Sequence, residues 1–212
     1  MSRAFRLGIT GKIGSGKSTL SEVARRNGIR VLEADIIAKE VMTTDTDVRK
    51  KIETLFGPDA YKNGTLNRTY LASKIFSDET IRIKLEEIVH PVTLEVFEEE
   101  FRKANQGEII ALESALLFQT GLDELFDAVI LIEAKDDDVI SREEASGKFS
   151  REDTLNRLDQ QHYQDDWKED ADFVIQNTES QVVFTQRCEA LIALIKVVSV
   201  QELPEKSLRS LD

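Results

Sequence analysis

The stretch Gly11-Lys12-Ile13-Gly14-Ser15-Gly16-Lys17-Ser18 fits the pattern G-x-x-x-x-G-K-[ST] of a phosphate-binding loop. Its glycines let the backbone curl so that successive N–H groups point inward at phosphate oxygens. The apolar run 5–10 before the loop suits a buried strand, and segment 18–26 after it favours a helix whose N-terminus would face an anion. Strand, loop and helix in this order favour a nucleotide site over a glycine-rich structural turn.

Two side chains of the loop have the chemistry to act on a nucleotide. We expect Lys17 to reach the β- and γ-phosphates and the Ser18 hydroxyl to ligate Mg²⁺. ATP and Mg²⁺ are therefore the expected cofactors. The loop residues predicted to bind ATP are consecutive: Gly11, Lys12, Ile13, Gly14, Ser15, Gly16, Lys17, Ser18 and Thr19.

Composition limits the class of protein. The 212 residues, 41% of them hydrophobic, suffice for one α/β core with an insertion, and no run of about eighteen apolar residues could cross a membrane. The formal net charge of -12 argues against non-specific binding to nucleic acid or to a membrane surface. We therefore expect a cytoplasmic protein with small-molecule partners, as a monomer or small homo-oligomer. The single cysteine, Cys188, lies in an apolar helical pattern and is expected to be a core thiol.

The second expected strand, at 29–32, leads to a carboxylate. Asn27-Gly28 predicts a left-handed end to the preceding helix. Ligands of open α/β sheets gather at the carboxyl ends of the strands, so Asp35 should lie beside the phosphate loop. The alternative is that Asp35 only caps the helix that begins at Ile36.

Segment 43–105 is predicted to be helical, without further strands. Asn63-Gly64 is an expected turn, Ser77 or Asp78 an expected helix cap, and the proline at 91 predicts a break or kink at His90. Several small-molecule kinases place an acceptor-binding lobe at this point of the chain. Arg68 and His90 are its candidate binding residues, although a surface arginine and a helix-terminal histidine are ordinary alternatives.

Three more strands are expected at 109–112, 128–132 and 173–175, followed by a last helix at 181–199. Glu113 after the third strand is either a carboxylate that acts on Mg²⁺ through the ion's bound waters or a strand-end cap. Segment 135–167 is dense in charge, which is typical of solvated helices and also of a mobile lid over a phosphate. In this segment Gly147 is a possible hinge, and Ser150-Arg151-Glu152-Asp153 predicts a capping box.

The fold class predicted is α/β: a parallel five-stranded sheet with flanking helices, of the phosphate-loop kinase type, with a helical acceptor-binding insertion and a helical lid. We expect a single domain over 1–212. Its core would comprise about 1–42, 107–134 and 168–199, the acceptor lobe about 43–106, and the lid about 135–167.

Taken in order, these features resemble the dephospho-coenzyme A kinase family over about residues 7–195. The stretches that carry the resemblance are 10–19, 34–41 (Ala-Asp-Ile-Ile-Ala-Lys-Glu-Val), 64–68 (Gly-Thr-Leu-Asn-Arg), 89–91 (Val-His-Pro), 116–118 (Leu-Leu-Phe) and 171–177 (Ala-Asp-Phe-Val-Ile-Gln-Asn). The phosphate loop alone fits many families, whereas the Ala-Asp, the His-Pro and the late Ala-Asp…Asn in this order are much more specific.

The resemblance implies transfer of the γ-phosphoryl group of ATP to the 3′-hydroxyl of dephospho-coenzyme A. It implies that Asp35 orients that hydroxyl and accepts its proton, while Arg68 and His90 face the phosphates of the acceptor. It places Thr19 at the α-phosphate and Asn177 near the adenine. Lys17 and Arg142, the latter from the lid, would meet the charge on the transferring group.

The chain departs from the usual family pattern at several positions. The family usually has Gly at Lys12, Asp at Glu33, Pro at Ala115 and Glu at Gln119, and a second lid arginine where this chain has Ser146. Lys148 or Arg151 could replace that arginine. The alternatives are a nucleoside monophosphate kinase or other small-molecule kinase, and a nucleotide-binding relative with impaired lid chemistry. A GTP-dependent switch lacks support, because the Asn-Lys-x-Asp motif for guanine is absent.

Overall fold

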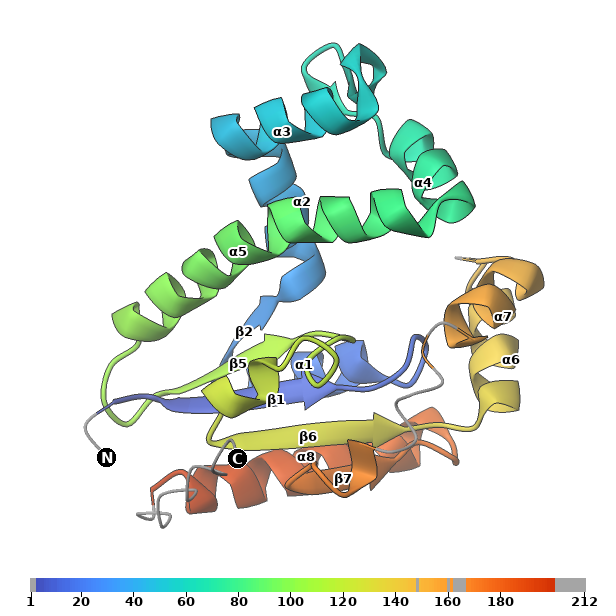
Figure 1. The fold of residues 1–212 in the computed structure, drawn as a ribbon. Coiled ribbons are helices and arrows are strands. Elements are labelled where there is room, and N and C mark those ends of the chain that lie inside the picture. The colour runs from blue at the N-terminus through green and yellow to red at the C-terminus, as the bar shows by residue number, and fades with distance from the viewer. Residues whose placement is uncertain (1–2, 148, 160, 162–166, 201–212) are drawn as a thin grey trace, which may run out of the picture. The chain divides into compact units, whose positions relative to one another are not determined.

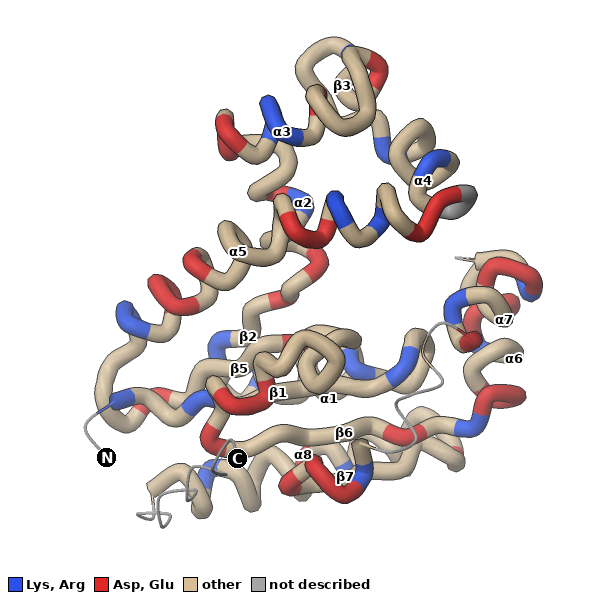
Figure 2. Tube along the Cα trace, in the orientation of Figure 1, with Lys and Arg blue, Asp and Glu red and all other residues tan. Residues whose placement is uncertain are grey.

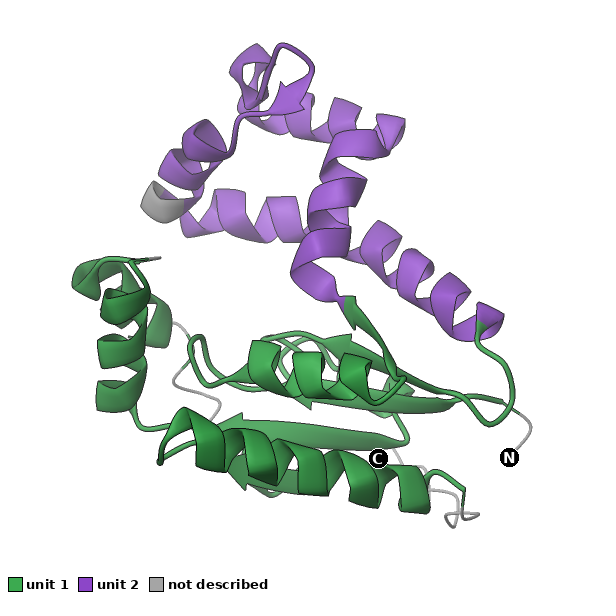
Figure 3. Cartoon of the chain, turned by 180° about the vertical axis from the view of Figure 1, so that it is seen from behind, with its two compact units in different colours: residues 1–32, 104–212 green, residues 33–103 purple. Residues whose placement is uncertain are grey.

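The computed structural model describes residues 3–147, 149–159, 161 and 167–200. The chain divides into two compact units (Figure 3): unit 1 comprises residues 1–32 and 104–212, and unit 2 comprises residues 33–103. Each unit is described by itself below.

A five-stranded sheet organises unit 1 (Figure 1). Its order is β2-β5-β1-β6-β7, and the pairs β1–β5, β1–β6 and β6–β7 are parallel. The strands are β1 (Phe5–Thr10), β2 (Arg30–Glu33), β5 (Ile109–Glu113), β6 (Ala128–Glu133) and β7 (Phe173–Gln176). The predicted fold class is confirmed. Because β1 is the central strand, the loop after it starts from the middle of the sheet's carboxyl edge.

Two helices pack on one face of this sheet. α1 (Lys17–Arg26) and α8 (Gln181–Val198) share a buried apolar cluster with β1, β6 and β7, which includes Leu20, Phe184 and Cys188. Cys188 is fully buried, which confirms the predicted core thiol, and burial raises the pKa of that thiol to about 12. Gly28, with φ of 81°, follows α1 in the predicted left-handed conformation.

Segment 114–126 covers the opposite face of β1 and includes a short 3-10 helix, η2 (Leu122–Leu125). A Cβ atom added to Gly8 would lie 3.1 Å from both Leu117 Cδ1 and Val129 Cγ2, so this face is tightly packed. Leu117 and Phe126 are buried there. The sheet is thus covered on both faces, as a parallel sheet requires.

The segment predicted to be a lid forms a helical hairpin of α6 (Asp136–Ser146) and α7 (Arg151–Asp159). Gly147 ends α6 with φ of 65°. The predicted cap at Ser150 is confirmed, because its hydroxyl accepts a hydrogen bond from the Asp153 N–H (3.1 Å) and donates one to Asp153 Oδ2 (2.7 Å). Val139, Ile140 and Leu158 form a small buried cluster between the two helices.

Unit 2 is mostly helical but is not free of strands. It contains α2 (Ala34–Thr44), α3 (Thr46–Phe56), η1 (Pro58–Ala60), β3 (Tyr61–Lys62), β4 (Thr65–Leu66), α4 (Arg68–Ser77) and α5 (Glu79–Lys103). The expectation of no further strands was wrong, since β3 and β4 pair as an antiparallel hairpin around the predicted Asn63-Gly64 turn. Both turn residues have positive φ, 53° and 80°, which suits a two-residue hairpin connection.

Of the break or kink predicted at His90, the structure shows no break, only a bend of α5 (Figure 1). α5 continues through Pro91, its middle residue, although its axis bends near the middle (Figure 1). Val89, Thr93 and Phe97 are buried on both sides of the proline, and the Thr93 hydroxyl donates to the Val89 carbonyl oxygen across it (2.8 Å). Packing on both sides therefore outweighs the local preference of the residue before proline.

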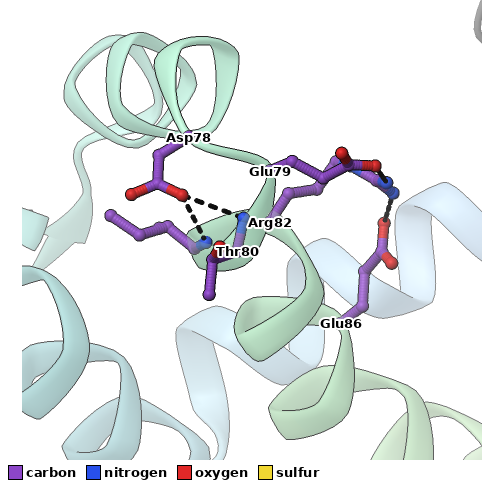
Figure 4. Close-up of polar contacts among 6 residues, drawn as sticks. Asp78, Glu79, Thr80, Arg82 and Glu86 are labelled. Carbon is purple, nitrogen blue, oxygen red and sulfur yellow. Dashed lines mark hydrogen bonds and ion pairs between the residues drawn. The ribbon is translucent and has the colours of Figure 1, made fainter.

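The start of α5 is capped by Asp78, one of the two predicted candidates (Figure 4). Its Oδ1 accepts hydrogen bonds from the N–H groups of Thr80 (2.9 Å) and Ile81 (3.3 Å). Arg82 in the following turn lies between Glu86 (2.8 Å) and Glu79 (3.1 Å) and pairs with both. The cap and these ion pairs fix the first turns of α5. In the part of the chain that the structure describes, no helix combines the length and hydropathy needed to cross a bilayer.

Candidate active site

The phosphate loop follows β1 and needs glycine where its backbone approaches other elements closely. Gly11 has φ of 145°, and a Cβ atom there would lie 2.5 Å from the carbonyl oxygen of Ile132. Gly16 has φ of 113°, and its Cβ atom would lie 2.7 Å from Phe184 Cε1 and from Asn177 Nδ2. Only glycine adopts this path without strain or collision, so these contacts fix the curl of the loop.

Lys17, the first residue of α1, lies over this loop. Its Nζ donates hydrogen bonds to the carbonyl oxygens of Gly11 (2.7 Å) and Lys12 (2.9 Å). The N–H groups of Thr19 and Leu20 donate to the Gly16 carbonyl oxygen at 3.0 and 3.2 Å. A charged ammonium and a helix N-terminus therefore occur together at the carboxyl end of the central strand, which is an anion-binding arrangement.

Asn177, directly after β7, holds the loop from a distant part of the chain. It is 4% exposed, and its Nδ2 donates a hydrogen bond to the Ser15 carbonyl oxygen (2.8 Å). Its own N–H donates to the Glu133 carbonyl oxygen (2.8 Å). The structure thus brings Asn177 to the predicted site, where its side chain supports the loop. No sequence pattern indicates this hydrogen bond, because its two partners are far apart in the chain.

Arg142 of α6 reaches the same place. Its Nη2 donates to the Asn177 carbonyl oxygen (2.8 Å), while its Nη1 is buried without a hydrogen-bond partner. Of the two proposed substitutes for the second lid arginine, Arg151 pairs with Glu144 at 3.4 Å, both side chains being exposed, and Lys148 lies outside the described residues. At Ser146 the hydroxyl donates to the Glu143 carbonyl oxygen (2.8 Å).

Buried polar atoms without partners gather around this loop. Among the described residues they are Thr10 Oγ1, Ser15 Oγ, Arg142 Nη1 and Glu143 Oε2. Buried polar groups normally have hydrogen-bond partners, so such a group of unpaired atoms marks a place where a ligand would supply them. Sequence reasoning missed Glu143, because an acidic residue in a charged helix looks like a solvated one.

The amino-terminal end of α6 also meets the loop. Lys12 Nζ lies 3.4 Å from Asp136 Oδ1, in a first turn that contains three consecutive aspartates (Figure 2). A Cβ atom on Gly14 would lie 2.8 Å from Val139 Cγ1 and 3.0 Å from Glu143 Oε1. The loop therefore closely approaches α6 at Lys12 and at Gly14.

Oxygen ligands suited to a hard cation lie beside α1. The predicted Mg²⁺ ligand, Ser18, is exposed in the first turn, and Ser21 one turn later donates a hydrogen bond to Glu113 Oε2 (2.5 Å). No cluster of three or more His, Cys, Asp or Glu is found among the described residues. Mg²⁺ bound to phosphates takes only one or two protein oxygens and keeps several waters, so this donor set fits it.

The remaining predicted residues belong to unit 2. Asp35 is exposed and is the second residue of α2, whose N-cap is Glu33. The interpretation of Asp35 as the cap of a helix beginning at Ile36 was therefore wrong. Arg68 is the exposed first residue of α4, and His90 is exposed in the middle of α5.

Comparison with known proteins agrees with this geometry. The family model described as dephospho-CoA kinase matches residues 5–182. A dephospho-CoA kinase of Salinibacter ruber is 38% identical over 174 residues, which cover 81% of this chain and 87% of that protein. One of Listeria monocytogenes is 34% identical over 178 residues, 82% of this chain and 88% of that protein. The solved dephospho-CoA kinase from Campylobacter jejuni superposes with a TM-score of 0.69 at 27% identity, covering 91% of this chain and 98% of its own.

Proposed function

The chain belongs to the dephospho-coenzyme A kinase family and transfers the γ-phosphoryl group of ATP to dephospho-coenzyme A, and we propose that unit 1 binds ATP and unit 2 supplies the acceptor site. The observation that carries this proposal is the phosphate loop of unit 1. This loop brings together the Lys17 ammonium and the first turn of α1. Beside them lie two buried polar atoms without hydrogen-bond partners, Ser15 Oγ and Arg142 Nη1.

Phosphoryl transfer requires little covalent chemistry from the protein, so positioning and charge neutralisation set the rate. In our proposal Lys17 Nζ, which the loop carbonyl oxygens hold in place, pairs with the β- and γ-phosphates. Arg142 already donates a hydrogen bond from Nη2 to the Asn177 carbonyl oxygen, and it offers Nη1 to the transferring group. Thr19, whose hydroxyl accepts from Gln181 Nε2 (3.1 Å), lies at the α-phosphate.

Mg²⁺ would be held by Ser18, with Glu113 as the nearby carboxylate. When bound, it supplies positive charge to the phosphate oxygens. The other loop residues contribute backbone N–H groups, apart from Ile13 and Ser15, whose N–H groups are used within the protein. Asn177 contributes by holding the Ser15 carbonyl group, and its place near the adenine stays a prediction.

On the acceptor side, we assign Asp35 to the 3′-hydroxyl group, which it orients and from which it accepts the proton. Its exposed carboxylate in the first turn of α2 is open to a ligand and is not needed as the cap. Arg68 and His90, both exposed on unit 2, are assigned to the phosphates of the acceptor. The α6–α7 hairpin is the proposed lid.

The cellular location, oligomeric state and metal of the enzyme are also part of what we propose. We expect it to work in the cytoplasm, as a monomer or small homo-oligomer, with Mg²⁺ as its metal. The net charge of -12 repels a negatively charged nucleotide. This supports the view that nucleotide binding depends on the local basic groups and the metal.

The test is to supply ATP, Mg²⁺ and dephospho-coenzyme A and to look by mass spectrometry for a product that has gained one phosphate. Nucleoside monophosphates and shikimate serve as competing acceptors in parallel reactions. We expect phosphorylation of dephospho-coenzyme A alone. Phosphorylation of a nucleoside monophosphate with dephospho-coenzyme A left unchanged would overturn the proposal.

A further inference from the structure

The peptide group between Lys12 and Ile13 in the phosphate loop makes hydrogen bonds through both its carbonyl oxygen and its N–H group. Its carbonyl oxygen accepts hydrogen bonds from Lys17 Nζ (2.9 Å) and from the Ser15 N–H (3.2 Å). In a trans peptide the C=O and N–H groups point in opposite directions. The Ile13 N–H therefore points away from Lys17, and it needs a partner outside the loop.

That partner is the side chain of Gln161, which follows α7. Its Oε1 accepts the Ile13 N–H at 2.8 Å, across 148 positions of sequence. Gln161 is itself held, because its backbone N–H donates to the carbonyl oxygen of Leu158 (2.9 Å) at the end of α7. The end of α7 therefore holds Gln161 in place as the hydrogen-bond partner of the Ile13 N–H.

The side chain of Ile13 strengthens the same connection. It packs against the buried cluster of Val139, Ile140 and Leu158 between α6 and α7. Residue 13 is therefore bound to the helical hairpin by both its backbone and its side chain. A loop residue whose only role was to shape the phosphate-binding backbone would need neither contact.

We propose that Gln161 is a positioning residue for Lys17. By accepting the Ile13 N–H it fixes the orientation of the Lys12–Ile13 peptide, and the carbonyl oxygen on the other side of that peptide then holds the Lys17 ammonium over the phosphate site. The inference rests on the proposed function of Lys17. Without Gln161 the Ile13 N–H loses its partner, and the Lys12 carbonyl oxygen that accepts from Lys17 Nζ is less firmly oriented.

The change to test is Gln161→Met, which keeps the length of the side chain and removes the acceptor. Its matched control is Gln186→Met, the same change at an exposed glutamine of α8. We expect Gln161→Met to weaken ATP binding about 3- to 10-fold, the factor that corresponds to the net contribution of one hydrogen bond. The control should bind ATP like the wild type.

A double-mutant cycle separates this role from a general structural one. If Gln161 acts through Lys17, Gln161→Met should have no further effect on ATP affinity in a Lys17→Met background. A full additional loss in that background would overturn the inference. So would unchanged affinity of Gln161→Met in an otherwise wild-type enzyme that still phosphorylates dephospho-coenzyme A. If the wild type binds no ATP at all, it is the proposed function that fails.

A second measurement needs no nucleotide and covers a Lys17→Met variant too weak to titrate. Amide hydrogen exchange of Ile13, followed by NMR in the ligand-free protein, should accelerate in Gln161→Met and stay unchanged in Gln186→Met. It should also accelerate in Lys17→Met, because the Lys12 carbonyl oxygen then keeps only the longer bond from the Ser15 N–H and orients the peptide less firmly. An Ile13 amide that exchanges as in the wild type in both Gln161→Met and Lys17→Met would refute the coupling.

Discussion

Replacing Asn177 by leucine tests whether the strand-end asparagine holds the phosphate loop. The substitution keeps a side chain of similar size at a site that is 4% exposed, and it removes the N–H group that donates to the Ser15 carbonyl oxygen at 2.8 Å. Ser15 is fully buried, so we expect its carbonyl oxygen to be left without this donor in a place that water does not easily reach.

The cost follows from that geometry. A buried acceptor left unsatisfied costs about 1–3 kcal/mol. The site also has little room, because Asn177 Nδ2 is 2.7 Å from the position of a Cβ atom on Gly16. For a protein of this length each kcal/mol lowers the melting temperature by roughly 2–4 °C, so a fall of about 2–12 °C is expected. Nucleotide affinity should fall by up to about 10-fold for each 1.4 kcal/mol of lost loop organisation.

The assay is thermal unfolding together with the KM for ATP, measured on three variants. Asn177→Leu should lose stability and affinity. Asn177→Asp should be at least as impaired, since it keeps the shape but turns a carboxylate oxygen toward the Ser15 carbonyl oxygen. Gln176→Leu, at the exposed neighbouring position, is the control and should resemble the wild type. If Asn177→Leu melts and binds ATP like this control, the loop does not depend on Asn177, and the reasoning is refuted.

Four further predictions concern the chemistry of the site. Lys17→Met should lower turnover by about 10²- to 10³-fold, the scale of a lost transition-state donor, with the far-UV circular dichroism unchanged; wild-type turnover would remove Lys17 from the reaction. Asp35→Asn should lower turnover by roughly 10²-fold or more without lowering the melting temperature, because Glu33 and not Asp35 is the N-cap of α2; turnover within a few-fold of wild type would exclude it as the base. Chelation of Mg²⁺ should sharply weaken ATP binding measured by calorimetry, and tight metal-independent binding would contradict the role given to Ser18. Burial raises the pKa of the Cys188 thiol to about 12, so this thiol should resist alkylation at mildly alkaline pH until the protein unfolds. The same raised pKa should make the folded state less stable as the pH rises above the ordinary thiol value of about 8.5, because only the unfolded state then loses the proton. Rapid labelling of the native protein would show that Cys188 is not a core residue.

The sequence determined what depends on neighbouring residues. The pattern of the phosphate loop requires its glycines because of local backbone angles, and the strand before it and the helix after it follow from their own periodicity. Asp78 and Ser150 were identifiable as caps because a cap bonds to N–H groups two or three residues away. The start of α2 was misplaced by two residues, because the helix begins at Ala34 and its cap is Glu33.

The tertiary structure decided what depends on distant partners. The bonds of Asn177 to Ser15 and of Gln161 to Ile13 join residues 162 and 148 positions apart, and no local pattern specifies which side chain arrives there. α5 passes through Pro91 because buried residues on both sides hold it, against the preference of the residue before a proline. The sequence thus determined that a phosphate would be bound, whereas packing decided which side chains hold the loop that binds it, because a hydrogen bond or a buried contact forms only where the whole fold brings its two partners together.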